Sequence, residues 1–377
     1  MTVSPSPELN APEDWAAWLR LLETPGLGRE SARKLLAAFG SPDAVIAAST
    51  AARKEVVGPS TAAALELESP ALERLTEATR CWLHEAPPGS PRRLVTLGDP
   101  LYPPALLEMA DPPLLLYAQG RAELLQATGV AIVGSRQATP QGLENARSFA
   151  AALSEAGLTV VSGLAQGIDG AAHEGALQGP GSTIAVVGTG LDQVYPKRHA
   201  ALAQRLSLQG LILSEYALGT PPLAENFPQR NRIIAGLSRG TLVVEAALQS
   251  GSLISARLAS EAGRDVFAIP GSIHSPQSRG CHWLIKQGAK LVESAQDVLD
   301  EIQVRPPPVA AEVRDNSGEA SGDALLEALG FEPATLDALV ARTGWSPQQL
   351  NIRLLELELG GRVARLPGQL FQRVSAA

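Results

Sequence analysis

Apolar residues recur along this chain of 377 residues in two rhythms. Between residue 130 and about residue 294, short apolar runs rich in β-branched residues alternate with segments long enough for helices. The runs read VAIVG, LTVVSG, TIAVVG, LILSE, TLVVEA and DVFAIPG. Near-continuous apolar strands separated by helices are typical of a parallel sheet that is covered on both faces. The pattern predicts an α/β fold with an extended Rossmann-like, doubly wound, mostly parallel sheet.

The other rhythm occupies residues 14 to 85, where apolar residues follow the spacing of three and four that an amphipathic helix requires. The turn TPGLG joins two of these helices. In a helix-hairpin-helix module such a turn offers backbone N–H groups to a nucleic-acid phosphate, and otherwise it is an ordinary glycine-containing turn. We expect a helical N-terminal domain of the helix-hairpin-helix or SAM-like type.

After the α/β region, the stretch VRPPPVAAEVRDNSGEASGD reads as a flexible, partly extended linker. Beyond it, TLDALVARTGWSPQQLNIRLLELELGGRV has the rhythm of helix, turn, helix and a Gly-Gly turn into a strand, which is typical of a winged helix. We therefore predict four parts. They are the helical domain at residues 1–90, the Rossmann-like domain at 91–303, the linker at 304–322 and the winged-helix domain at 323–377.

Composition narrows the class of protein. The formal net charge is −8, which argues against a surface that is positive all over but leaves room for a local basic patch. The two cysteines, Cys81 and Cys281, lie far apart and outside any C-x-x-C pair, so they indicate neither a disulfide framework nor a zinc site. No apolar run reaches the roughly 18 residues that span a bilayer, and the first residues do not resemble a secretory signal. We expect a soluble, cytoplasmic protein.

The loops that follow the apolar runs hold the candidate chemistry, because ligands of a doubly wound sheet bind beyond the carboxyl ends of its strands. These loops read GSRQATPQG, SGLAQGIDGAAH, GTGLDQVYPKRH, SEYALGTPPLAENFPQRNR and EAALQSGSLISA. They are rich in Gly, Ser, Thr and Asn, and glycine lets the backbone approach an anion closely. The sequence predicts a rim suited to phosphate.

Motifs for nucleotide cofactors and for nucleophilic catalysis are missing. There is no G-x-x-x-x-G-K-[ST] sequence, and GTGLDQ holds only the first two glycines of the dinucleotide fingerprint. No serine sits in a G-x-S-x-G elbow. Asp169 opens a helix and is expected to cap it, while Glu245 ends a strand and is either a general base or a residue that orders neighbouring loops. We expect no cofactor, no metal and no catalytic residue.

Positive charge is concentrated in the second half of the α/β region. Residues 226 to 290 contain six Arg and two Lys against three acidic residues, although solvated helix faces would also account for such a run. Arg230 and Arg232 flank Asn231 in the polar turn NFPQRNR, just beyond Phe227. Arginine forks match phosphate, asparagine bonds base edges or sugar, and an aromatic ring stacks on an unpaired base. This turn predicts contact with single-stranded nucleic acid.

Several of these segments resemble one known family. The blocks VGSRQAT, SGLAQGIDGAAH, AVVGTGLDQVYP, SEY, NFPQRNRIIAGLS, VVEAALQSGSLISARLASEAGRDVFAIPG and LIKQGAKLV resemble the DNA-processing protein A family (DprA, also called Smf), in the same order and spacing. The resemblance covers roughly residues 95 to 295, and the flanking helical and winged-helix parts also look like those of the family. It implies a recombination mediator that is not an enzyme, binds and protects single-stranded DNA, helps to load the RecA recombinase in natural transformation, and acts as a homodimer.

The resemblance also implies which residues contact DNA. In this chain they are Gly134, Ser135, Arg136, Lys197, Phe227, Arg230, Asn231, Arg232, Gly251 and Ser252. The chain departs from the family where His199 replaces a frequent Asn and Ser255 replaces a frequent Thr. The hydroxyl survives at residue 255, whereas His199 adds a contact that is sensitive to pH.

Two other interpretations compete with DNA binding by the α/β domain. Nucleoside-monophosphate phosphoribohydrolases carry a similar Gly-rich turn with the pattern P-G-G-x-G-T-x-x-E, but LSRGTLVVE lacks the P-G-G and places Glu245 one residue too far from Gly240. In the other interpretation the chain is an adaptor that acts through its winged helix alone. Residues 321 to 377 hold five Arg against six acidic residues, so we expect this tail to contact other proteins, or DNA only in an accessory way.

Overall fold

The computed structural model describes residues 14–67, 70–302, 323–330, 333–366 and 370–374. The chain forms two compact units, each discontinuous in sequence: the first comprises residues 1–126 and 186–236, and the second comprises residues 127–185 and 237–377. The predicted linker at 304–322 lies outside the described residues, and the four predicted domain boundaries stay a prediction.

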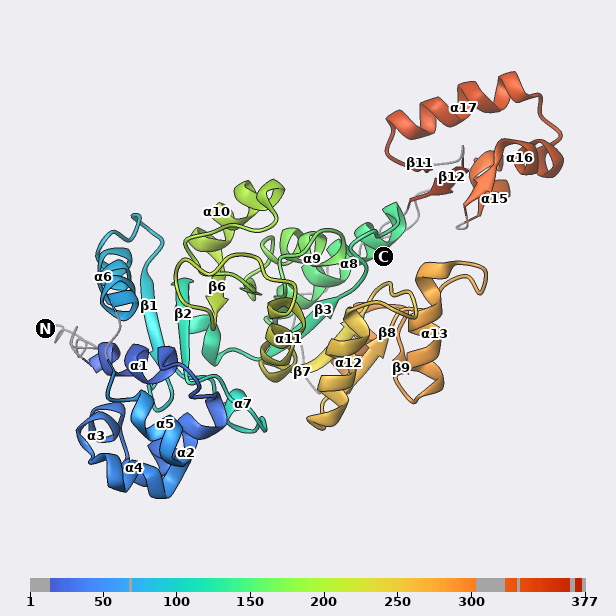
Figure 1. Cartoon of the computed structure of the whole chain (residues 1–377). Coiled ribbons are helices and arrows are strands. Elements are labelled where there is room, and N and C mark those ends of the chain that lie inside the picture. Colours follow the sequence, from blue (N-terminus) through green and yellow to red (C-terminus); the bar gives the residue numbers. More distant parts are fainter. Residues whose placement is uncertain (1–13, 68–69, 303–322, 331–332, 367–369, 375–377) are drawn as a thin grey trace, which may run out of the picture. The chain divides into compact units, whose positions relative to one another are not determined.

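The first unit contains the N-terminal helices and three strands (Figure 1). Its helices are α1 (Asp14–Glu23), α2 (Arg29–Phe39), α3 (Pro42–Ala47), α4 (Thr50–Val57), α5 (Pro59–Ala64), α6 (Pro70–His84), α7 (Pro104–Leu107), α10 (Ala200–Gln209) and α11 (Asn226–Gly236), with the 3-10 turns η1 (Ala122–Gln126) and η2 (Lys197–His199). Its strands β1 (Arg92–Thr96), β2 (Leu115–Gly120) and β6 (Leu211–Ser214) pair antiparallel, with β2 between the other two.

The N-terminal helices bury their apolar faces in two clusters. One cluster contains Leu21 and Leu35 and extends to Leu114, which lies directly before β2. The other joins Leu19 of α1 to Tyr117 of β2. The expected helical N-terminal region is present, and it shares its core with the antiparallel strands.

The turn predicted at NFPQRNR was wrong, because these residues form the first two turns of α11. Pro228 is the third residue of the helix, where a backbone N–H would have no partner within the helix in any case. The side chain of Asn226 donates to the carbonyl of Gly188 at 3.1 Å, and the last turn buries Ile233 and Ile234. Tertiary contacts at both ends therefore make a helix of a segment whose polar half has no apolar periodicity.

The second unit holds the parallel sheet, in the order β5-β4-β3-β7-β8-β9. Its strands are β3 (Gly129–Val133), β4 (Thr159–Ser162), β5 (Thr183–Val186), β7 (Ser238–Val243), β8 (Asp265–Ala268) and β9 (Lys290–Leu291). Its helices are α8 (Pro140–Glu155), α9 (Ile168–Ala176), α12 (Ser252–Glu261), α13 (Arg279–Lys286) and α14 (Ala295–Ile302), with the 3-10 turn η3 (Pro276–Ser278). All six predicted strands are present, including β6 in the first unit, and the fold class is confirmed.

The sheet of the second unit is covered by helices on both faces. Helices α8, α9 and α14 pack on one face in a cluster that includes Phe149, Val160 and Phe267. Helices α12 and α13 pack against β7 and β8 outside that cluster. Because β4 lies on one side of β3 and β7 on the other, the chain reverses its direction of winding between β3 and β7. A ligand of a doubly wound sheet binds at such a switch point.

The C-terminal part is a winged helix, as predicted. It consists of α15 (Ala324–Leu329), β10 (Ala334–Thr335), α16 (Leu336–Thr343), α17 (Pro347–Leu359), β11 (Val363–Leu366) and β12 (Leu370–Arg373). The three strands pair in the order β10-β12-β11. Ser346 and Gln349 form a reciprocal capping box at the start of α17, and Leu350 and Leu354 anchor this helix in a small separate core. Among the described residues of the whole chain, no helix combines the length and apolar character needed to cross a membrane.

Candidate nucleic-acid interface

The ten predicted contact residues are divided equally between the two units. Gly134, Ser135, Arg136, Gly251 and Ser252 belong to the second unit, whereas Lys197, Phe227, Arg230, Asn231 and Arg232 belong to the first. Their role in DNA binding stays a prediction, and each group is described within its own unit.

The group in the second unit lies at the switch point of the sheet, just beyond β3 and after β7. Gly134 is required by packing, since a Cβ atom there would approach Cγ1 of Ile168 to 2.6 Å. The backbone N–H of Ser135 donates to the carbonyl of Glu245 at 2.8 Å, and the Ser135 carbonyl accepts from the N–H of Ile168 at 3.2 Å. The turn is thus fixed on both sides, and Arg136, the next residue, is exposed.

Gly251 at the start of α12 has no structural reason to be glycine. Its φ is −61°, and a Cβ atom would find no atom within 4 Å. The neighbouring hydroxyls of Ser250 and Ser252 lie 2.7 Å apart, and Ser252 is buried. The backbone at Gly251 is therefore uncrowded, at the same end of the sheet as the turn after β3.

Glu245, after β7, orders the start of α8. Its carboxylate accepts from the N–H of Thr139 at 2.9 Å and from the hydroxyl of Thr139 at 2.5 Å. The same hydroxyl caps α8 by accepting from the N–H of Gly142, where a Cβ atom would lie only 2.3 Å from the Glu245 carboxyl carbon. Burial raises the pKa of Glu245, although the two hydrogen bonds from Thr139 oppose this. The structure therefore favours the loop-ordering role over that of a general base.

Asp169 is not the helix cap that the sequence predicted. Gly167 occupies the N-cap of α9, and Oδ2 of Asp169 accepts from the backbone N–H groups of Gly163 and Ala165 at 3.2 and 3.3 Å. Nε2 of His173 accepts from the backbone N–H of Leu164 at 3.3 Å. The φ of Leu164 is +58°. Both side chains hold the loop after β4 in a conformation that an L-residue rarely adopts.

In the first unit, Arg230 of α11 lies in the interior. It is 4% exposed, its Nη1 donates to the carbonyl of Val186, and its Nε donates to Oδ1 of Asn231 at 3.1 Å. A buried guanidinium needs such acceptors, because an unpaired one would cost several kcal/mol. The geometry thus assigns the Arg230 guanidinium to holding α11.

Arg232, two residues further, is also engaged internally. It donates to both carboxylate oxygens of Glu215 and, at 2.7 Å, to the backbone carbonyl of Asp111. The side chains of Arg232 and Glu215 are only 11% and 10% exposed. Neither predicted arginine of α11 presents an exposed guanidinium.

Next to these arginines lie an aromatic pair, in which Phe227 is half-buried and Tyr195 exposed, and an exposed lysine. The rings of Phe227 and Tyr195 lie 5.4 Å apart at 37°, and Tyr195 is 45% exposed. Lys197, two residues after Tyr195, is exposed as well. A Cβ atom at Gly188 would approach Cδ1 of Phe227 to 3.1 Å, so the glycine makes room for this ring. The sequence interpretation missed Tyr195, although it directly precedes the PK of the YPKRH segment.

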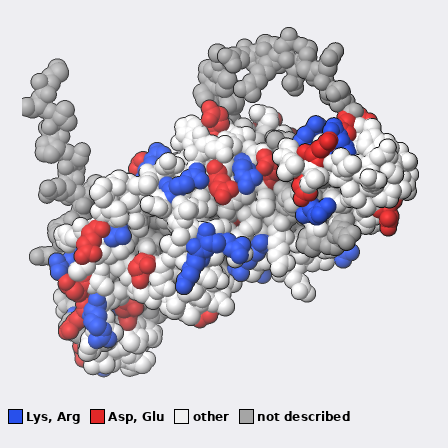
Figure 2. All heavy atoms as spheres, turned by 90° about the horizontal axis from the view of Figure 1, so that it is seen from above, with Lys and Arg blue, Asp and Glu red and all other residues white. Residues whose placement is uncertain are grey.

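Charge on the surface is mixed. Figure 2 shows Lys and Arg side chains interspersed with Asp and Glu on the face in view. This agrees with the formal net charge of −8. Binding of a polyanion would therefore rest on local groups of residues rather than on a wholly basic face.

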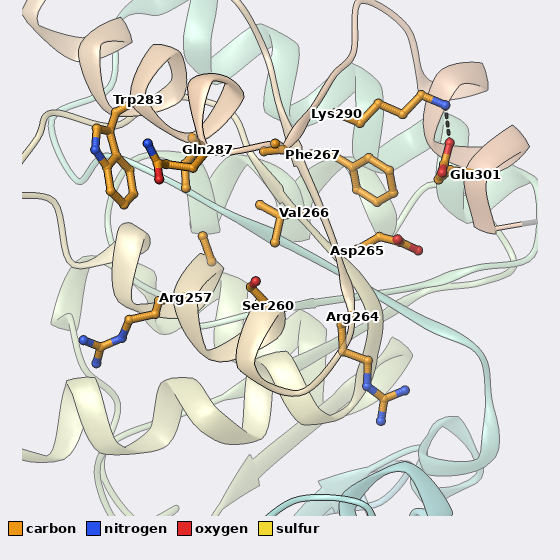
Figure 3. Close-up of a pocket in the computed structure, with 14 residues that line it drawn as sticks. Arg257, Ser260, Arg264, Asp265, Val266, Phe267, Trp283, Gln287, Lys290 and Glu301 are labelled. Atoms are coloured by element: carbon orange, nitrogen blue, oxygen red, sulfur yellow. Dashed lines mark hydrogen bonds and ion pairs between the residues drawn. The ribbon is translucent and has the colours of Figure 1, made fainter.

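A hollow of about 470 Å³ lies in the second unit where α12 and α13 border β8 (Figure 3). Its centre is formed by Val266 and Gln287, while Arg257 and Arg264 point away from it. Lys290 at its edge is paired with Glu301. None of the ten predicted contact residues lines this hollow, and its basic groups do not converge on one point.

A doubly wound sheet with its winding reversed between β3 and β7, followed by a C-terminal winged helix, defines the structural class of this chain. The family model of DNA recombination-mediator protein A matches residues 93–303, and the model of the DprA winged helix domain matches residues 304–369. The chain belongs to the DNA recombination-mediator protein A family, DprA/Smf.

Individual relatives agree with this assignment. The chain is 45% identical to Protein Smf of Escherichia coli over 300 residues, which is 78% of this chain and 79% of the relative. The solved DprA structure from Streptococcus pneumoniae has a TM-score of 0.66 and 40% identity, covering 76% of this chain and 97% of that one. The solved structure of DNA processing protein A from Helicobacter pylori was reported for its unique single-stranded DNA binding mode. It matches with a TM-score of 0.52 and 33% identity, covering 56% of this chain and 96% of that one.

The raised pKa of Glu245 predicts a pH dependence of stability. Above the ordinary glutamate value of 4.5, the folded protein binds more protons at this site than the unfolded chain does. The contribution of Glu245 to the free energy of unfolding should therefore fall as the pH rises through the folded pKa, and should be constant above it. In Glu245→Gln this component should disappear, and loss of one acceptor for Thr139 should lower the free energy of unfolding by about 1–3 kcal/mol.

Urea unfolding at a series of pH values checks this expectation. The exposed Glu155, at the end of α8, supplies the control, because Glu155→Gln removes a similar charge without touching Thr139. Equal pH slopes in the wild type and Glu245→Gln would contradict the assignment.

Proposed function

We propose that this protein is a recombination mediator that binds single-stranded DNA. The observation that carries the proposal is the match of residues 93–303 to the recombination-mediator family. The H. pylori relative, described by its single-stranded DNA binding mode, supports the choice of ligand. The proposal includes no catalytic step and no cofactor.

Phosphate and base contacts fall to different residues in this proposal. The exposed Arg136 and Lys197 neutralise phosphates, each from its own unit. Gly134, Ser135, Gly251 and Ser252 form the backbone that the DNA approaches after β3 and β7. These contacts require no particular base, so binding is expected to be largely independent of sequence.

The pair formed by Tyr195 and Phe227 stacks on unpaired bases. Aromatic rings are sequence-tolerant platforms, because every base has a π face. Arg230 and Arg232 contribute by holding α11, the helix that carries Phe227, and Asn231 accepts one hydrogen bond from Arg230.

Delivery of the strand to the RecA recombinase, and action as a homodimer, complete the proposal. Both are features that family membership implies for this chain. The winged helix is assigned to contacts with other proteins. Its third helix, α17, exposes Ile352, Leu355 and Leu359, while Arg353 on the same helix is paired with Asp323. An apolar face with its arginine engaged suits a protein partner better than a DNA backbone.

Loss of either exposed cation should weaken binding of single-stranded DNA. Arg136→Ala and Lys197→Ala should each raise the Kd of a labelled oligonucleotide about tenfold, because each removes a charge-assisted hydrogen bond to phosphate. Each should also reduce the slope of log K against log salt by about 0.7, the value for one phosphate contact on a single strand.

Titrations followed by fluorescence anisotropy across a salt series measure both quantities. Arg205→Ala on α10 and Lys286→Ala on α13 are matched controls, since both are exposed cations outside the predicted contacts. Unchanged Kd and slope in Arg136→Ala and Lys197→Ala would contradict the proposed interface.

Stacking on the aromatic pair predicts a different signature. Phe227→Leu and Tyr195→Leu should each weaken binding by about 1–3 kcal/mol while leaving the salt slope unchanged, because a ring neutralises no phosphate. Tyr195→Phe keeps the ring and should bind like the wild type. Competition titrations at fixed salt measure the loss, and a Tyr195→Phe defect equal to that of Tyr195→Leu would show that the hydroxyl, not the ring, matters.

Transfer to RecA can be tested with single-stranded DNA covered by single-stranded DNA-binding protein. The intact protein should shorten the lag of RecA filament assembly, which RecA ATP hydrolysis reports. Arg136→Ala should lengthen the lag again, because loading requires the mediator to be on the DNA. An unchanged lag with saturating wild-type protein would overturn the RecA part of the proposal and leave DNA binding intact.

A further inference from the structure

Five charged side chains connect the N-terminal helices to α11 within the first unit. Arg29 and Arg33 of α2 both contact the carboxylate of Asp111, with Arg29 Nε at 2.9 Å. Arg29 also lies 3.4 Å from the carboxylate of Glu215. Arg232 of α11 contacts both acidic residues, with its Nε 3.5 Å from Asp111 Oδ2. Three guanidinium groups thus share two carboxylates.

The segment that carries Asp111 is itself held by packing on both sides. Leu114 lies in the core of the N-terminal helices together with Leu35 of α2. The residues before Asp111 pack on the other side against the end of α11, where a Cβ atom at Gly236 would approach the sulfur of Met109 to 2.2 Å. Figure 1 shows α7 between α2 and α11. The contact between the two helices therefore runs through a fixed segment rather than a loose loop.

The first residue of α11 is fixed by further hydrogen bonds. The hydroxyl of Tyr216 donates to the carbonyl of Asn226 at 3.1 Å, and Asn226 donates to the carbonyl of Gly188 at 3.1 Å. Glu215 and Tyr216 are adjacent, so one dipeptide holds both the first residue of α11 and Arg232 near its end. The orientation of the helix depends on both attachments.

We propose that Arg29 and Arg33 of α2 are positioning residues for the single-stranded DNA interface, acting through Asp111, Glu215 and Arg232 on the orientation of α11. The inference rests on the proposed function, because it is Phe227 of α11 that would stack on the bases. The N-terminal helices, which need not touch DNA for this, would thereby set how well the α/β region binds it.

The pKa of Asp111 is consistent with its place among three arginines. Burial alone would raise the pKa of Asp111, but the hydrogen bond from Arg33 and the charges of Arg232 and Arg29 hold it below the ordinary value. Asp111 is therefore charged at neutral pH. Without Arg29 and Arg33, Arg232 would be left with two carboxylates, and the formal charge of the cluster would change from +1 to −1.

Two sets of variants separate positioning from simple attraction of DNA. Arg29→Gln with Arg33→Gln loses positive charge, whereas Asp111→Asn gains it, and both break the network. Positioning predicts about 2- to 30-fold weaker DNA binding in both, the range for couplings carried by packed networks. Simple attraction of DNA by positive charge predicts weaker binding in Arg29→Gln with Arg33→Gln and tighter binding in Asp111→Asn. That result would overturn the inference.

The salt slope and a matched control complete the binding experiment. Arg29 and Arg33 would contact no phosphate, so the slope of log K against log salt should stay at the wild-type value. A slope reduced by about 0.7 or more would mean direct DNA contact and would contradict positioning. Lys34→Gln removes a cation from the same helix but breaks only an exposed pair with Glu30, and it should bind DNA like the wild type.

Hydrogen exchange of the α11 amides in the absence of DNA gives a readout that does not depend on the proposed function. Exchange should be faster in Arg29→Gln with Arg33→Gln and in Asp111→Asn than in Lys34→Gln. Arg33→Lys, which keeps a cation on Asp111, should restore most of the protection when combined with Arg29→Gln. If the wild type fails to bind single-stranded DNA, the proposed function fails. If it binds and α11 exchange and affinity are unchanged in the variants, the positioning role fails.

Discussion

Two guanidinium groups of α11, those of Arg230 and Arg232, lie inside the first unit, and the position of the helix depends on the oxygen atoms that accept their hydrogen bonds. A cation removed from water costs several kcal/mol unless charge and hydrogen bonds replace its hydration. For Arg230 the acceptors are the Val186 carbonyl and Asn231, and for Arg232 they are Glu215 and Asp111. Val186, Glu215 and Asp111 come from separate parts of the chain, so α11 keeps its place only where all three meet. Phe227 is the second residue of the same helix, so these contacts also fix the position of its aromatic ring.

Much of the fold could be predicted from the sequence, because its strands are short, apolar and regularly spaced. VAIVG and TLVVEA could hardly be anything but buried strands once helices separate them, and they form β3 and β7. The winged helix was predictable from its rhythm of helix, turn and helix and from its Gly-Gly turn. NFPQRNR misled the interpretation because its polar residues resemble a turn. Their helical state depends on acceptors such as Val186, which lies 44 residues from Arg230 and cannot be read from local sequence.

The types of residue at the candidate site could be predicted from the sequence, but which of these residues are exposed could not. Arg136 follows a strand in a glycine-containing turn, and it is indeed exposed after β3. Arginine is almost never fully buried unless it is paired, so the interior position of Arg230 contradicts the expectation that the sequence alone supports. Tyr195 was missed because its partner Phe227 lies in another segment of the sequence, and the two rings meet only in the folded protein.

The discontinuous units have a consequence for the nascent chain. Domains usually fold as their residues leave the ribosome, beginning from the N-terminus. The N-terminal helices need little beyond Leu114 to close their cluster, but β2 pairs on one side with β1 and on the other with β6, which is synthesised only after β3, β4 and β5. An unpaired strand edge is a template for aggregation. One edge of β2 therefore stays without its partner strand from the emergence of β2 until that of β6.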